Sequence, residues 1–229
     1  MPKRKLITES DVHEAAKRGA RALSVEEGAI VTPSARDAAS KLNVQLLAEP
    51  LPSAKTAFDS VSIFHPANKQ AIQRETIVAL GADHGGFSMK EQLKAYLLEL
   101  GYSVADVGTN SDQACDYPDF AYAVASLVSS GKAKKGIMID AVGVASAIVA
   151  NKVPGIRAVA ATNEFVARSS REHNDANVLT LGGRVLGIEV AKSITKLWLE
   201  TWFGGGRHQA RVKKIGEIEE RTLRRPREL

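Results

Sequence analysis

Five short hydrophobic runs in the C-terminal part of the chain have the length and composition of buried strands. They are TIVALG (76–81), SVADVG (103–108), GIMI (136–139), IRAVAA (156–161) and NVLTL (177–181). Each contains few polar residues, which is typical of strands that are covered on both faces of a sheet. We therefore expect five buried strands.

Between these runs, apolar residues recur every three or four positions, as in amphipathic helices. In the stretch 87–100 the apolar positions Met89, Leu93, Tyr96, Leu97 and Leu100 share one face, and Gly101 follows as a helix-ending residue. Further helices are predicted from an N-cap at Asp116 to Ser130, after the turn that Asp140 opens, from about Asn163, from Ile188 to Thr201, and from about Gly206.

Strands that alternate with helices predict an α/β fold with a three-layer, doubly wound parallel sheet, Rossmann-like, of about five strands. Right-handed crossovers would place helices on both faces. The carboxyl ends of parallel strands lie at one edge of the sheet, and open α/β proteins bind their ligands there. We expect the functional site at that edge.

The first 49 residues predict a small N-terminal αβ extension. A helix is expected over Asp11–Arg21 and another over Ser34–Leu42, with Thr32 before Pro33 as a helix start. Residues 50–73 have no clear period and predict a linker. The expected division is therefore 1–49, the linker 50–73, and a main domain over 74–229.

Composition narrows the class of protein. The chain has 229 residues, of which 44% are hydrophobic and 25% charged, as in globular proteins. No apolar run reaches the roughly 20 residues of a membrane helix, so no membrane partner is expected. The basic N-terminus lacks the apolar segment of a secretory signal. A single cysteine, Cys115, fits a reducing cytoplasm.

The net charge of +5 comes largely from a basic C-terminal segment. No aromatic residues interleave with these cations and no nucleic-acid-binding motif is present, so we expect a small phosphorylated ligand rather than nucleic acid. A solvated basic helix is the alternative for part of this segment.

Polar residues that suit acid–base and anion chemistry gather around the predicted strands. Asp83 and His84 follow the first strand, Asp140 follows the third, and His173 precedes the fifth. We expect all of them at the same edge of the sheet. There is no dinucleotide or P-loop signature and no metal-binding motif, so neither a cofactor nor a metal is expected.

Residues 76 to about 220 resemble the type B ribose-5-phosphate isomerase and galactose-6-phosphate isomerase family. The matching blocks are DHGGF (83–87), DYPDFA (116–121), REHNDANVL (171–179), LGGRVLG (181–187) and GGRHQARV (205–212). The resemblance implies aldose–ketose isomerisation of a phosphorylated sugar through an enediolate, without cofactor or metal. It also implies a homodimer, or a dimer of dimers, with each site at a subunit interface.

The resemblance assigns roles to individual residues. His173 matches the histidine that opens the sugar ring, and a helix-capping histidine is the alternative. Asp83 and Asn174 match contacts to the sugar, and Tyr117 matches a pocket residue whose alternative role is core packing. His84, Arg207 and Arg211 match ligands of the phosphate, and the arginines reach the partner subunit's site in the family. Gly143 belongs to the backbone that binds the enediolate.

The turn after the third strand departs from the family pattern. Many members have Cys-Gly-Thr-Gly-x-Gly there, with the cysteine as the proton-transferring base, whereas this chain has Asp140-Ala-Val-Gly143-Val-Ala. A glutamate that another branch uses is replaced by Ser146. Three interpretations are open. Asp140 is the base, with a pKa raised by burial; the chain is the cysteine-lacking subunit of a hetero-oligomeric isomerase; or it binds a sugar phosphate with little turnover. A helix-capping Asp140 is the structural alternative.

The N-terminal segment around Gly28–Ala39 resembles small modules on enzymes of bacterial microcompartments. That resemblance implies targeting or assembly. We favour the alternative, an αβ appendage that packs on the dimer.

Overall fold

The structure is a computed structural model, and it describes residues 6–25, 30–48, 61–64 and 74–223. The chain forms two compact units, Met1–Asp59 and Ser60–Leu229. The boundary falls within the stretch expected as a linker, most of which lies outside the described residues. Each unit is described by itself.

The C-terminal unit is built on a six-stranded sheet with the order β5-β7-β6-β8-β10-β9. All neighbouring strands are parallel except β5 and β7. The strands are β5 (Ile63–Phe64), β6 (Arg74–Ala82), β7 (Tyr102–Asp106), β8 (Lys135–Asp140), β9 (Ala158–Ala160) and β10 (Val178–Gly182). The predicted parallel α/β sheet is confirmed.

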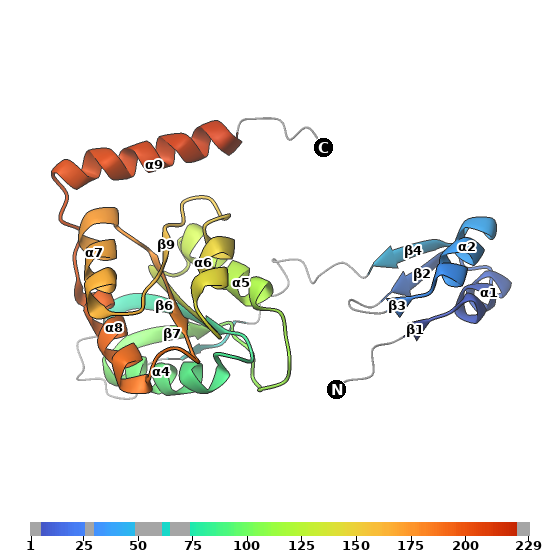
Figure 1. The fold of residues 1–229 in the computed structure, drawn as a ribbon, viewed down its shortest axis with the longest axis horizontal. Coiled ribbons are helices and arrows are strands. Elements are labelled where there is room, and N and C mark those ends of the chain that lie inside the picture. The colour runs from blue at the N-terminus through green and yellow to red at the C-terminus, as the bar shows by residue number, and fades with distance from the viewer. Residues whose placement is uncertain (1–5, 26–29, 49–60, 65–73, 224–229) are drawn as a thin grey trace. The chain divides into compact units, whose positions relative to one another are not determined.

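Helices cover both faces of this sheet. They are α4 (Phe87–Glu99), α5 (Tyr117–Ser129), α6 (Val144–Ala150), α7 (Glu164–Asn174), α8 (Ile188–Glu200) and α9 (Arg207–Leu223). Helices α5 and α6 pack on one face, whereas α4 and α8 pack on the other (Figure 1). Because the chain leaves β6 toward β7 and then returns to β8 on the other side, the topological switch point lies between β6 and β8.

The hydrophobic pattern explains these elements. Met89, Leu93 and Leu97 of α4 are buried against the sheet, as their spacing predicts. In β8, Gly136 through Asp140 are all buried, which is why this strand has a continuous apolar run rather than an alternating one.

The short strand β5 falls in the stretch predicted as a linker, and that prediction is wrong for these residues. Ile63 pairs with Ala105 and Phe64 with Val104 in an antiparallel ladder. A strand of two residues has no measurable period, so only its pairing with β7 identifies it.

The N-terminal unit consists of two β-α-β segments with the same local structure. The first contains β1 (Leu6–Ile7), α1 (Glu9–Lys17) and β2 (Ala22–Val25); the second contains β3 (Ile30–Val31), α2 (Pro33–Lys41) and β4 (Gln45–Ala48). Strand β1 pairs in parallel with β3, and β2 with β4. The two helices pack together over a small shared apolar core.

The two segments also use matching helix ends. Thr8 and Thr32 are the N-cap residues of α1 and α2. After each helix one residue adopts a left-handed conformation: Gly19 with φ 75° and Asn43 with φ 52°. Such a residue ends a helix, which explains why α1 stops at Lys17 rather than at Arg21 as predicted. The unit is therefore an internal tandem repeat.

Three loops at the carboxyl edge of the main sheet touch one another through their backbones. A Cβ added at Gly86 would lie 2.3 Å from the Ile139 carbonyl oxygen. One at Gly183 would lie 2.7 Å from the Gly85 oxygen, and one at Gly182 2.6 Å from the Val142 oxygen. Only glycine permits such close approach, so these glycines hold the loops after β6, β8 and β10 together.

We predict that Gly86→Ala lowers the free energy of unfolding by about 1–3 kcal/mol, because the methyl group must displace the end of β8. Gly187→Ala is the matched control, since its φ is −71° and no atom lies within 4 Å of the added Cβ. Urea denaturation measures both variants. Equal stabilities would contradict the close-contact account.

Candidate active site

The carboxylate of Asp140 holds the turn between β8 and α6. Its Oδ1 accepts hydrogen bonds from the amides of Val142, at 2.7 Å, and of Gly143. Its Oδ2 accepts from the amide of Ser146, at 3.0 Å, and from the Ser146 hydroxyl. Since an ionised carboxylate has about four acceptor positions, these four bonds use all of them.

These hydrogen bonds decide the protonation of Asp140. Burial acts to raise its pKa, but the bonds from the Ser146 hydroxyl and the amides of Gly143, Val142 and Ser146 hold the pKa of Asp140 below its usual value. The expectation that burial raises this pKa toward neutrality is therefore wrong. The amide of Gly143, the N-cap residue of α6 with φ 90°, is already used in its hydrogen bond to Asp140.

Asp83, in the loop after β6, uses only one of its carboxylate oxygens. Oδ1 accepts from the amides of Gly85, at 2.8 Å, and Gly86, at 3.1 Å, which fixes the start of α4. Within the described residues Oδ2 makes no hydrogen bond, although Asp83 as a whole is buried. The two roles weighed for Asp83, a cap and a sugar contact, are thus compatible.

His84 is fixed by the loop that follows β7. Its Nδ1 lies 3.1 Å from the carbonyl oxygen and 3.3 Å from the amide of Cys115, and the Cys115 thiol is 4.0 Å away. With Nδ1 occupied, Nε2 is the atom of His84 available to a ligand. Tyr117, half-buried at the start of α5, follows Cys115 closely in the chain. The structure therefore brings Cys115 beside His84, and Tyr117 begins α5 two residues further on.

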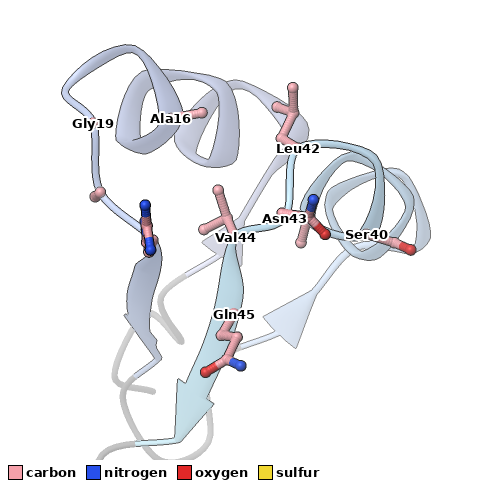
Figure 2. Close-up of a pocket in the computed structure, with 10 residues that line it drawn as sticks. Ala16, Gly19, Ser40, Leu42, Asn43, Val44 and Gln45 are labelled. Carbon is pink, nitrogen blue, oxygen red and sulfur yellow. The ribbon is translucent and has the colours of Figure 1, made fainter.

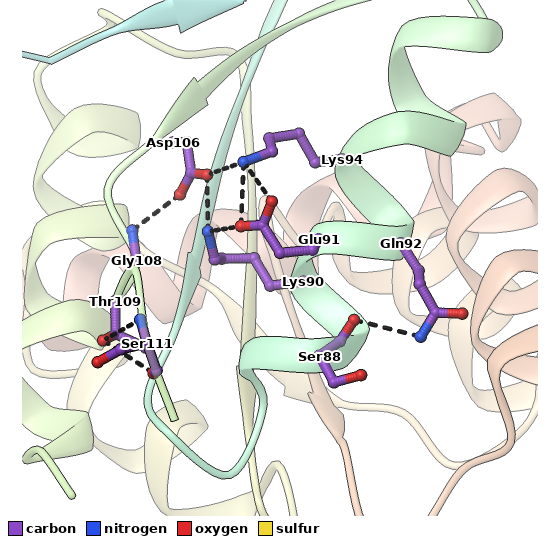
Figure 3. A network of polar contacts seen from close by, with 9 residues as sticks. All are labelled: Ser88, Lys90, Glu91, Gln92, Lys94, Asp106, Gly108, Thr109 and Ser111. Atoms are coloured by element: carbon purple, nitrogen blue, oxygen red, sulfur yellow. Dashed lines mark hydrogen bonds and ion pairs between the residues drawn. The ribbon is translucent and has the colours of Figure 1, made fainter. Parts of the chain in front are cut away.

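A network of buried charges anchors the same loop (Figure 3). The ammonium of Lys90, fully buried on α4, donates to Asp106 Oδ2 at 2.7 Å and to Glu91. Lys94 donates to both carboxylates, and Asp106 Oδ1 accepts from the amide of Gly108. Although burial acts to raise it, hydrogen bonds from Lys90 and Lys94 hold the pKa of Glu91 below its usual value. One partner of Lys90, Asp106, lies 16 residues away in the sequence, so the helical pattern alone does not reveal this pair.

A second cluster of chemically active side chains joins α7 and α9. The rings of His173 and His208 stack, with centroids 4.3 Å apart and an interplanar angle of 16°. Nδ1 of His173 lies 3.1 Å from the Ser169 hydroxyl. Arg207 and Arg211 are exposed one turn apart on α9, beside His208. Asn174 ends α7 with its side chain exposed.

This second cluster lies at the amino edge of the sheet, so the expectation that all candidate residues share the carboxyl edge is wrong. Helix α7 ends at Asn174, and β10 begins at Val178, which pairs with Gly136 near the start of β8. A residue that directly precedes a parallel strand lies at its amino end. The length of β8, about 17–20 Å, separates His173 from Asp140.

His208 was not among the residues singled out from the sequence. The pKa of His208 lies below its usual value. Desolvation is the main cause, and the positive charges of His173, Arg207 and Arg211 add to it. The GGRH block contains this histidine, but its stacking on His173 depends on how α9 returns to α7.

The N-terminal unit has a cavity of a different character (Figure 2). It is lined by Ala16, Gly19, Ala20, Arg21, Ala39, Ser40, Leu42, Asn43, Val44 and Gln45. Arg21 is the single charged residue among them, and the lining has no histidine or carboxylate. This cavity therefore offers no acid–base pair for catalysis.

Two further features of the described residues bear on function. No group of three or more histidine, cysteine or acidic side chains is arranged to hold a metal ion there. Among the described helices, none combines the length and the apolarity needed to cross a membrane.

We predict that Asp140→Asn lowers the free energy of unfolding by about 2–4 kcal/mol, because an amide cannot accept all four hydrogen bonds. Ser146→Ala, which removes one of them, should cost about 1–2 kcal/mol. The pKa of Asp140 is lowered on folding, so its contribution is full above about pH 4 and is lost as the pH falls through the folded-state pKa.

Urea denaturation at pH 7, 5 and 3 measures this effect. The difference between wild type and Asp140→Asn should be large at pH 7 and 5 and smaller at pH 3. A difference that grows at pH 3 would contradict the assigned role of the carboxylate.

Comparison with known proteins assigns the family. The family model described as "Ribose/Galactose Isomerase" matches residues 78–215. The chain is 47% identical over 144 residues to ribose-5-phosphate isomerase B of Escherichia coli, covering 63% of this chain and 97% of that protein. It is 38% identical to galactose-6-phosphate isomerase subunit LacA 1 of Streptococcus pyogenes, over 62% and 98% of the two chains.

A solved structure gives the same answer for the fold. Ribose-5-phosphate isomerase B of Clostridium thermocellum superposes with a TM-score of 0.63 at 49% identity, over 64% of this chain and 99% of that one. The matched region is the C-terminal unit, which contains both clusters described above. The chain belongs to the ribose/galactose isomerase family.

Proposed function

We propose that the protein is an aldose–ketose isomerase of phosphorylated sugars that acts through an enediolate. Within a family of such isomerases, one observation supports the proposal most. The chain carries both a carboxylate at the switch point, Asp83, whose Oδ2 has no partner among the described residues, and a cluster of histidines and arginines. Isomerisation needs a base that moves a proton between C1 and C2, an acid–base group for ring opening, and cations for the phosphate.

We assign the proton transfer to Asp83 rather than to Asp140. All acceptor positions of Asp140 are used by the turn, whereas Oδ2 of Asp83 has no partner within the described residues. A Cβ built at Gly85 would lie 3.2 Å from Asp83 Oδ1 and also 3.2 Å from Ala141. Asp83 therefore adjoins the turn after β8, where the family pattern has its cysteine. Asp140 then acts as a positioning residue, and Gly143 contributes its left-handed conformation.

The remaining candidates take the roles that the family resemblance implies. His173 opens the sugar ring and Asn174 contacts the sugar. Arg207 and Arg211 bind the phosphate together with Nε2 of His84. Within the part of the chain that the structure describes, the hydroxyl of Tyr117 makes no hydrogen bond, and it serves as a donor to a sugar oxygen.

These roles require two copies of the chain in each site. The amino-edge and carboxyl-edge clusters are too far apart within one chain to contact a single small substrate. Helix α9 has no buried residue within its described length, and its Ile215 and Ile218 are exposed. Val142 and Ile148, beside the carboxyl-edge turn, are exposed as well. A homodimer, or a dimer of dimers, that covers these apolar residues would bring the arginines of one copy to the Asp83 loop of its partner.

The sugar is a tetrose, pentose or hexose phosphate, with ribose 5-phosphate as the first to test.

A second candidate function follows from the missing cysteine: the chain acts as one subunit of a hetero-oligomeric isomerase. The match to a galactose-6-phosphate isomerase subunit favours it.

We place the protein in the cytoplasm and give the N-terminal unit a role in assembly. The described residues of the N-terminal unit form a cavity with one charged side chain, Arg21, and no acid–base pair. Association with a microcompartment, implied by the resemblance around Gly28–Ala39, is the more specific form of that role.

The test is incorporation of solvent deuterium into a panel of tetrose, pentose and hexose phosphates, followed by NMR. Wild type should exchange the proton of at least one sugar. Asp83→Asn should slow that exchange by about 10²–10⁴-fold, the usual contribution of a general base. Asp140→Asn should slow the exchange only as far as it reduces the fraction of folded protein. Asp112 is an exposed aspartate in the loop after β7, and Asp112→Asn is the matched control.

Two results would contradict these assignments. Normal exchange by Asp83→Asn, with none by folded Asp140→Asn, would make Asp140 the base. No exchange by wild type with any sugar would mean that this chain alone is not an isomerase, and a second subunit would then be sought.

A further inference from the structure

A cavity of about 590 Å³ lies at the amino edge of the main sheet, at the opposite end of β8 from Asp140. Residues at the starts of β6, β7 and β8 and near the end of α8 contribute to it. Its lining is Thr76, Tyr102, Lys134, Lys135, Arg171, Leu199, Glu200, Thr201 and Trp202. The carbohydrate chemistry proposed above uses none of these side chains.

Two of the cations in this cavity have donor groups that find no acceptor among the described residues. Arg171, which is buried, donates from Nη1 to Asp175 and the Ala176 carbonyl oxygen, and from Nε to the Thr201 carbonyl oxygen. Within the described residues its Nη2 makes no hydrogen bond. The ammonium of Lys135 has no carboxylate partner in that part of the chain either; it lies 5.4 Å from the centre of the Trp198 ring.

Both cations lie on the same aromatic ring, since the guanidinium carbon of Arg171 is 5.7 Å from the Trp198 centroid. Like charges held together in a partly buried site repel each other. The pKa of Lys135 is lowered to about 7, mainly by burial and next by the positive charge of Arg171. The charge of Asp175 acts to raise this pKa, and that of Arg157 acts to lower it. Among the described residues that line the cavity, three cations therefore stand against one carboxylate, Glu200.

We propose that this cavity is a binding site for a small divalent oxyanion, such as sulfate or the phosphate group of a metabolite, separate from the sugar-phosphate site. An anion between Lys135 and Arg171 would accept hydrogen bonds from the unpartnered Nζ and Nη2 atoms. Lys134, at the mouth of the cavity, adds a third positive charge, and Glu200 is the one carboxylate in the lining. Arg207 and Arg211 do not line the cavity, so the two anion sites use different cations.

The two tryptophans of the chain provide a selective signal for this site. Trp198 contacts both cations and Trp202 lines the cavity, and the chain has no other tryptophan. Full-length protein is titrated with sodium sulfate at pH 6 while tryptophan fluorescence is followed, with sodium chloride of equal ionic strength as the reference. We expect a saturable change with sulfate alone.

Variants locate the signal. Lys135→Met should weaken sulfate binding at least tenfold, and Lys152→Met, an exposed lysine that does not line the cavity, should leave it unchanged. Lys135→Arg keeps the positive charge and should keep sulfate binding. It is the second variant to test if Lys135→Met does not fold. A change that does not saturate, that chloride reproduces, or that folded Lys135→Met retains would overturn the proposal.

The pH dependence provides a second test. Sulfate keeps its charge between pH 6 and 8.5, whereas Lys135 loses its proton in that range. Among the described residues, the charged groups around Lys135 are Arg171 of α7, Asp175 at the C-cap of that helix, Arg157 before β9, Lys134, and Glu200 of α8. Sulfate affinity should fall about tenfold from pH 6 to 8.5 in wild type and stay level in Lys135→Arg. An equal fall in both proteins would contradict the role of Lys135.

Discussion

The carboxylate of Asp140 organises the carboxyl edge of the sheet. By accepting four hydrogen bonds it closes the turn between β8 and α6. The backbone of this turn also holds the loop after β10. The amide of Gly183 donates to the Asp140 carbonyl oxygen at 2.7 Å, and the amide of Arg184 donates to the Ala141 carbonyl oxygen. The loop after β6 is joined by the bond from the Asp83 amide to Ile139. In this chain the aspartate thus stabilises by hydrogen bonding the turn at which the family resemblance leads one to expect a cysteine.

The connectivity of a parallel sheet imposes a second constraint. Residues after a strand lie at the carboxyl edge, and residues directly before one lie at the amino edge, so Asp83 and His173 are at opposite ends of the same sheet. The exposed helix α9 and the exposed apolar residues beside the β8 turn supply surfaces that a second copy can cover. The proposed site depends on this separation, since neither cluster alone contains a base, a ring-opening histidine and phosphate-binding arginines.

The sequence predicts the fold well because burial patterns determine it locally. The continuous apolar run of β8 and the spacing of Met89, Leu93 and Leu97 correctly predict a buried strand and a helix face. Long-range contacts are what the pattern does not contain. The pairing of β5 with β7 and the stacking of His208 on His173 each join segments whose approach depends on the assembled sheet. The sequence thus identifies most candidate residues but not their grouping.

The most direct test of the shared site is subunit complementation between Asp83→Asn and His173→Ala. Each variant alone should be nearly inactive, because every site in its homodimer lacks one essential group. Co-expression at equal levels should restore about one quarter of wild-type activity, since half of the dimers are hybrids and each hybrid has one intact site. No recovery, despite hybrid dimers shown by native mass spectrometry, would contradict a site built from two copies of this chain.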